Sequence, residues 1–165
     1  TIHKFLYAFR PTWKEDFNEF DVAFVSLIPI VKQFIQRKII TVTHKLEAQE
    51  QVKNFYTSAE DKRIIVMDKP YPADDFLMEM PEPLYKVSPN ANRTAWGVKT
   101  IRKTGEEFEN RKDLPSAWGG LRDEELQKIT GVADAIFCHN ALFLATALSK
   151  DGAVALAKLA VDAET

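Results

Sequence analysis

The chain has 165 residues, of which 45% are hydrophobic, and its formal net charge at pH 7 is -2. A chain of this size can bury a core without disulfide bonds or a structural metal, so we expect one domain over residues 1–165. The charge excludes a protein that coats nucleic acid by bulk positive charge, and any contact with nucleic acid has to be local.

The N-terminal third is dominated by a helical pattern. Arg10-Pro-Thr-Trp13 predicts a turn, and apolar residues then recur at a spacing of three or four. Pro29 lies inside this pattern and is expected to kink the helix near 24–28. A weaker pattern continues to Phe55, as a second helix or as a continuation of the first, and residues 58–62 end it. The apolar positions are Phe17, Phe20, Phe24, Leu27, Ile28, Val31, Phe34 and Ile35, with Phe24, Leu27 and Val31 expected on the buried face.

The middle of the chain predicts short strands. Ile64–Met67 is rich in β-branched residues and is typical of a core strand, which the prolines that follow cannot continue. Residues 73–80 are long enough for one or two helical turns. Segments 83–88 and 94–102 alternate apolar and polar residues around a Pro-Asn-Ala-Asn turn, which predicts an antiparallel hairpin. Leu121–Gly131 is a short helix with acids early, Lys128 late and Gly131 as its end.

The stretch Ala135–Leu148 is the centre of the predicted domain. Its apolar run is broken once by His139-Asn140, which predicts two buried strands, or one bent strand, joined by a polar turn. Ser149 is a good N-cap for the helix that follows, and small and apolar residues share one face of that helix at 153, 156, 157 and 160. His139 and Asn140 are thereby placed at a strand end, where ligands often bind.

The order of elements mixes an antiparallel hairpin with crossover units. We therefore predict an α+β fold, in which a mixed sheet of about five strands packs with helices and follows a long N-terminal helical segment. The single cysteine, Cys138, lies in an apolar run and is expected to be a buried thiol in a reducing compartment. Pro29, Lys32 and His139 interrupt the apolar runs, so we expect no membrane span, and the opening residue Thr1 suggests part of a longer protein.

Two groups of residues are candidates for ligand binding. Arg111, Lys112 and Arg122 flank Trp118 in a loop with glycines, a set that can hold a phosphate and stack a base. In the alternative interpretation, Trp118 packs under the loop and the charges are solvated. His139 and Asn140 can bond a ligand or can equally close a turn.

Catalytic and metal-binding residues are not indicated. His3, His44 and His139 do not stand at metal-ligand spacing. Asp74-Asp75 and Asp123-Glu124-Glu125 fit solvated helix starts better than paired catalytic carboxylates. Cys138 and His139 are neighbours on a strand and point to opposite faces, so they cannot act as nucleophile and base.

Three segments resemble the C-terminal half of the melanocyte-proliferating-gene (MYG) family. They are Arg10-Pro-Thr-Trp13, the block from Arg111 to Leu126, and Thr130 to Asn140 with Phe143. Their order is the same as in the family, so the resemblance covers the chain from about Arg10 to Val161, and the block around Trp118 is specific. The family is itself similar to the DHH phosphoesterases and includes metal-dependent RNA exonucleases.

The resemblance implies a function for the chain as one half of a two-domain enzyme. In the family, metal ions sit in an N-terminal domain with His-x-Asp and Asp-His-His type motifs, neither of which occurs in this chain. The chain is then the substrate-holding domain of a metal-dependent phosphodiesterase or 3′–5′ RNA exonuclease, inactive without that domain and its Mn or Mg. We keep one alternative, a non-enzymatic protein-interaction module that uses the Phe-rich helices between Phe17 and Phe55.

The resemblance and the residues together predict the site, the partners and the compartment. The expected substrate-binding residues are His139, Asn140, Arg122, Trp118 and Arg111, gathered on one rim of the sheet. Many family members have a Gly-rich run after the histidine, which residues 141–147 lack, so close approach of the backbone to a phosphate is less favoured. The expected partners are the N-terminal catalytic domain, a short single-stranded RNA or nucleotide, and a second copy in a homodimer, but no membrane. A bacterial protein would be cytoplasmic, and a eukaryotic one mitochondrial or nuclear.

Overall fold

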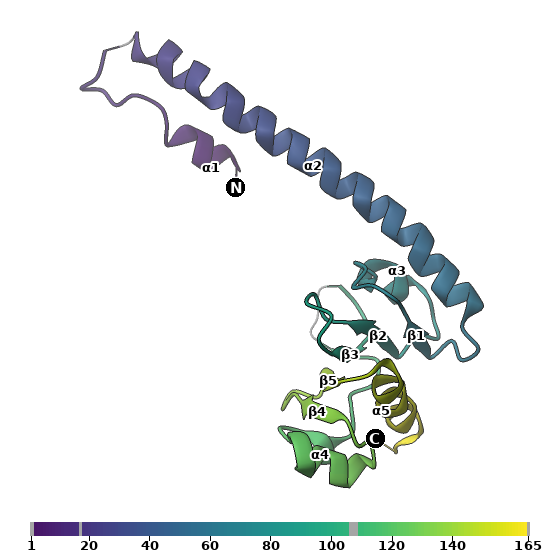
Figure 1. The fold of residues 1–165 in the computed structure, drawn as a ribbon. Coiled ribbons are helices and arrows are strands. Elements are labelled where there is room, and N and C mark those ends of the chain that lie inside the picture. Colours follow the sequence, from purple (N-terminus) through teal and green to yellow (C-terminus); the bar gives the residue numbers. More distant parts are fainter. Residues whose placement is uncertain (1, 17, 106–108, 165) are drawn as a thin grey trace. The chain divides into compact units, whose positions relative to one another are not determined.

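The computed structural model describes residues 2–16, 18–105 and 109–164, and the chain divides into two compact units, 1–46 and 47–165. The first unit holds α1 (Ile2–Tyr7) and most of α2 (Glu19–Ser58) (Figure 1). The second unit holds the end of α2 and all later elements. The two units are therefore described separately.

Helix α2 is one continuous element of 40 residues with Pro29 inside it. The sequence left open whether a second helix follows or the first helix continues, and the structure shows that the first helix continues. Pro29 removes one backbone hydrogen bond, but the flanking turns keep theirs and the helix goes on. The kink at 24–28 stays a prediction. None of the described helices is both long enough and apolar enough to cross a membrane.

The first unit corrects one prediction about burial. Phe24 is 67% exposed, while Leu27 and Val31 are half-buried beside Leu6 of α1 in an apolar hollow. The expectation that Phe24 is buried is therefore wrong, and Phe17 lies outside the described residues. The periodicity identified the apolar face, but it did not reveal that the short helix α1, which the sequence did not predict, lies beside this face.

The second unit is built on a five-stranded mixed sheet in the order β1-β2-β3-β5-β4, which confirms the predicted α+β class. The strands are β1 (Ile64–Val66), β2 (Tyr85–Pro89), β3 (Trp96–Thr100), β4 (Ala135–Cys138) and β5 (Leu144–Ala147). β1 and β2 are parallel and the other neighbours are antiparallel, so the predicted hairpin is confirmed as β2 and β3. The two strands of the central stretch are also confirmed, although β4 lies at an edge and β3 in the middle.

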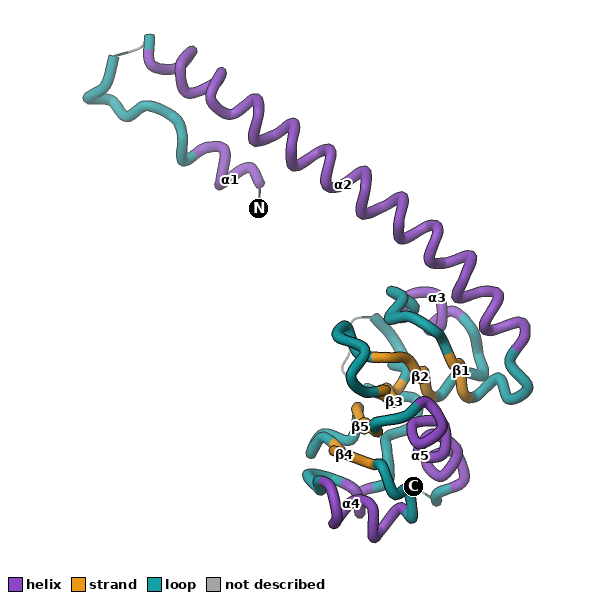
Figure 2. The backbone as a smooth tube through the Cα atoms, viewed as in Figure 1, coloured by secondary structure: helices purple, strands orange, loops and turns teal. Residues whose placement is uncertain are grey.

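Helices α4 (Asp123–Thr130) and α5 (Lys150–Asp162) complete the main core on one face of the sheet (Figure 2). Ser149 caps α5 as predicted, because its Oγ accepts from the Gly152 amide at 2.9 Å. The predicted face of α5 is fully buried at Ala153, Leu156, Ala157 and Ala160. Gly131 ends α4 in the left-handed conformation, with φ 71°.

The other face of the sheet is covered only in part. A second apolar cluster joins Ile65 of β1 to Val52 near the end of α2 and to Leu77 of α3 (Asp74–Glu79). None of the buried residues of this cluster comes from β3, β4 or β5. The face therefore changes from an apolar core near β1 to polar and aromatic side chains over the later strands.

Candidate functional site

The uncovered part of the sheet carries two rows of side chains, which we call together the open face. Val87, Val98 and Ala145 belong to the core beneath α5, so their neighbours along each strand point the other way. The first row is Lys86, Lys99, Leu144 and His139, the last joined by its amide to the Leu144 carbonyl at 2.8 Å. The second row is Ser88, Gly97, Thr146, Phe137 and Arg122.

The structure brings together the two loops that the sequence singled out. The Gly120 amide donates to the Cys138 carbonyl at 3.0 Å, and the Cys138 amide donates to the Leu121 carbonyl at 3.0 Å. Arg122 continues this pairing through a β-bridge with Phe137. The segment 118–122 thus runs along the edge strand β4 and reaches the turn that begins at His139.

A cation and three rings form a continuous chain of contacts on the open face, in which the rings meet edge-to-face or tilted. The Arg122 guanidinium carbon lies 4.4 Å from the centroid of the Phe137 ring. The Phe137 and His139 ring centroids are 6.1 Å apart, and those of His139 and Phe143 are 4.5 Å apart. These separations are within the range of favourable aromatic and cation–π contacts. We call Arg122, Phe137, His139 and Phe143 the stacking platform.

The backbone of the turn determines which ring nitrogen of neutral His139 carries the proton. The Ala141 amide donates to Nδ1 at 3.0 Å, so Nδ1 is an acceptor and the neutral imidazole carries its proton on Nε2. Nε2–H is therefore the donor that His139 offers to a ligand. The neighbouring Cys138 is buried as predicted, and burial raises the pKa of its thiol to about 11, so it is protonated at neutral pH.

Leu142 gives the turn a strained backbone. Its φ is 55°, in the left-handed region that glycine enters freely and leucine does not. The Leu142 amide donates to the His139 carbonyl at 2.8 Å, and the Leu142 carbonyl accepts from the Leu114 amide at 2.9 Å. These bonds hold the turn in a conformation that a Gly-rich run would adopt without strain.

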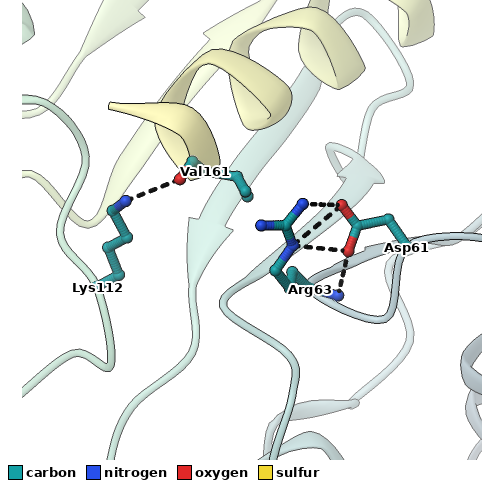
Figure 3. A network of polar contacts seen from close by, with 4 residues as sticks. All are labelled: Asp61, Arg63, Lys112 and Val161. Carbon is teal, nitrogen blue, oxygen red and sulfur yellow. Dashed lines mark hydrogen bonds and ion pairs between the residues drawn. The ribbon is translucent and has the colours of Figure 1, made fainter. Parts of the chain in front are cut away.

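Three other predicted residues face inward. The Trp118 side chain belongs to the core and is 5% exposed, which fits the interpretation that it packs under its loop. Arg111 donates to the carbonyls of Met78, Met80 and Pro83. Lys112 donates to the Val161 carbonyl at 2.9 Å and ties the loop to the end of α5 (Figure 3). These side chains hold the loop in place.

A cavity of about 530 Å³ adjoins the stacking platform at Phe143. Lys86, Lys99 and Arg102 line it together with Asp74 and Asp75. Sequence reasoning missed this group. The sequence signal for it was the alternation of apolar and polar residues in β2 and β3, which places Lys86 and Lys99 on the open face.

Within residues 2–16, 18–105 and 109–164, no three His, Cys, Asp or Glu side chains are grouped to hold a metal ion. Asp74 is instead paired with Lys86, and the three acids that start at Asp123 occupy the first turn of α4.

Comparisons with known proteins agree on one family. The model MYG1_exonuc, described as Uncharacterised protein family (UPF0160), matches residues 1–161. A MYG1 protein of Caenorhabditis elegans is 25% identical over an alignment of 169 positions, which covers 93% of this chain and 50% of that protein. A MYG1 protein of Saccharomyces cerevisiae is 29% identical over an alignment of 167 positions, which covers 92% of this chain and 49% of that protein.

A relative whose name states an activity matches a shorter part of the chain. The MYG1 exonuclease of Homo sapiens is 33% identical over 63 residues, which are 38% of this chain and 17% of that protein. The chain spans about half the length of the Caenorhabditis and Saccharomyces relatives. No solved structure matches it significantly.

Proposed function

The chain belongs to the MYG1_exonuc family, whose model matches residues 1–161, and from this we propose that it is the substrate-holding part of a metal-dependent phosphodiesterase that removes nucleotides from the 3′ end of single-stranded RNA. The relatives named MYG1 exonuclease support the nuclease class. In this proposal the catalytic residues and a divalent metal, Mn or Mg, belong to an N-terminal domain outside this chain. That domain is the principal partner.

The observation that carries the proposal is the stacking platform. A base that stacks on an aromatic face gains about 1–3 kcal/mol whatever its identity, because every base has a π-face. An exonuclease has to hold successive nucleotides of any sequence, and stacking meets this need. Arg122 at one end of the platform supplies a cation for a phosphate, and His139 Nε2–H supplies a donor for a phosphate or base oxygen.

The five predicted substrate-binding residues then have two kinds of role. His139, Asn140 and Arg122 border the ligand, because the first two begin the turn and Arg122 lies beside Phe137. Trp118 and Arg111 act indirectly, since one packs in the core and the other binds backbone carbonyls. Their contribution is to keep the loop beside β4.

Removal of platform residues is expected to slow the full-length enzyme. His139→Ala and Arg122→Ala should each lower kcat/KM on single-stranded RNA by at least about 10-fold, roughly 1.4 kcal/mol of transition-state binding. The melting temperature should change by only a few degrees, because neither side chain is fully buried. Lys128→Ala, which removes an exposed cation from α4, is the control. Unchanged turnover in both variants would refute the role of the platform.

The chain by itself is expected to hydrolyse nothing. The proposal assigns the metal ligands to another domain, and the sequence lacks the corresponding motifs. Purified chain should release no nucleotide from single-stranded RNA in the presence of Mn or Mg. Nuclease activity that co-purifies with the chain in two different chromatography steps would contradict this expectation.

A second candidate is a protein-interaction module, which the exposed apolar residues of α1 and α2 favour. Examples are Phe5, Phe24, Ile28 and Ile35, exposed by 49%, 67%, 51% and 51%. Determination of the natural reading frame discriminates between the candidates. An upstream segment with paired His and Asp motifs supports the enzyme half, and a start codon just before Thr1 supports the module.

A further inference from the structure

Two lysines stand directly opposite each other on the open face. The register of β2 and β3 pairs Lys86 with Lys99, and like charges in such a pair repel. Lys86 is only 8% exposed and is neutralised by an ion pair with Asp74. Lys99 is exposed, and its ammonium group makes no hydrogen bond or ion pair with any residue in the described ranges. Among the residues that the structure describes, Lys99 is thus a cation without a paired carboxylate.

The cavity of about 530 Å³ lies over this pair. Its lining carries three cations, Lys86, Lys99 and Arg102, against two carboxylates. Asp74 is already paired with Lys86, and Asp75 and Arg102 each have interactions of their own. Among the described lining residues, the positive charge left for a ligand is therefore that of Lys99.

The cavity and the stacking platform share one residue. Phe143 lines the cavity, and its ring is also 4.5 Å from that of His139. Lys99, Leu144 and His139 follow one another across the sheet, so Lys99 and His139 are two strand spacings apart, about 10 Å between their backbones. An oligonucleotide that stacks one base on the platform can therefore extend into the cavity without leaving the open face.

We propose that this cavity is a second subsite, which takes a phosphate of the nucleotide next to the one on the stacking platform, with Lys99 as its cation. This inference rests on the proposed function and adds where the phosphate of the second nucleotide is held. The volume of the cavity is in the range of ligand pockets and exceeds the needs of a lone phosphate. An ammonium group binds phosphate oxygens by charge-assisted hydrogen bonds. A mononucleotide reaches only the platform.

Calorimetric titration of the purified chain tests the subsite. The probes are AMP and the 5′-phosphorylated adenylate dinucleotide, and the dinucleotide should bind more tightly. Lys99→Gln should weaken dinucleotide binding by about 10-fold and leave AMP binding unchanged. It should also reduce the slope of log K against log salt by about 0.7, as expected for one lost phosphate contact on a single strand. Lys150→Gln, an exposed lysine at the start of α5, should change neither affinity.

The outcomes separate the two proposals. Equal binding of AMP and dinucleotide, or equal weakening of both by Lys99→Gln, overturns the second subsite and leaves the platform intact. No binding of either probe overturns the proposed function itself. Circular dichroism establishes that Lys99→Gln is folded, and Lys99→Glu, which reverses the charge, should weaken dinucleotide binding further.

Discussion

Replacement of Leu156 by alanine is expected to lower the free energy of unfolding by about 2–5 kcal/mol. Leu156 is fully buried where α5 packs on the sheet, and the small residues Ala153, Ala157 and Ala160 around it leave no side chain that can swing into the cavity. The loss should appear in urea denaturation as a lower midpoint with an unchanged slope.

Phe24→Ala is the control for this prediction. Phe24 is 67% exposed, so its removal should cost less than about 1 kcal/mol although the side chain is larger. A loss as large as that of Leu156→Ala, and one that grows with protein concentration, would mean that association covers Phe24. A loss below about 1 kcal/mol for Leu156→Ala would contradict the core described for the second unit.

The elements that the sequence predicted well are those with local causes. Ser149 caps α5 through a bond to an amide three residues away, and Gly131 ends α4 by its own φ. The hairpin follows from alternation within each strand. In contrast, the exposure of Phe24 depends on which element covers α2, and a spacing of three or four does not contain that information.

The same distinction divides the candidate site. The turn at His139 was predictable because a polar pair interrupts an apolar run. Its nearness to Arg122 was predictable because only one short helix and one strand separate them. The inward direction of the Arg111 side chain was not predictable, because the carbonyls that it binds, those of Met78, Met80 and Pro83, belong to a segment distant in the sequence. The Lys86–Lys99 pair required the register of β2 and β3, which a long turn between them does not fix.

Replacement of Gly120 by alanine is expected to weaken AMP binding at a moderate cost in stability. Gly120 has φ 79°, so alanine costs about 1–2 kcal/mol in backbone strain. The added Cβ would lie 2.2 Å from Asn140 Oδ1. That atom ends a flexible, exposed side chain, so Asn140 rotates away and the loop keeps its bonds to β4. AMP affinity should fall by about 10-fold if Asn140 orients the nucleotide.

Gly131→Ala is the control that separates backbone strain from the displacement of Asn140. Gly131 has φ 71°, and a Cβ there would meet no atom within 4 Å. Its alanine variant should therefore lose about the same 1–2 kcal/mol in denaturation while AMP affinity stays unchanged. Both variants carry the same backbone penalty, and only Gly120→Ala displaces Asn140. AMP affinity that is equal in the two variants would remove Asn140 from the site and leave the platform to act through stacking and Arg122 alone.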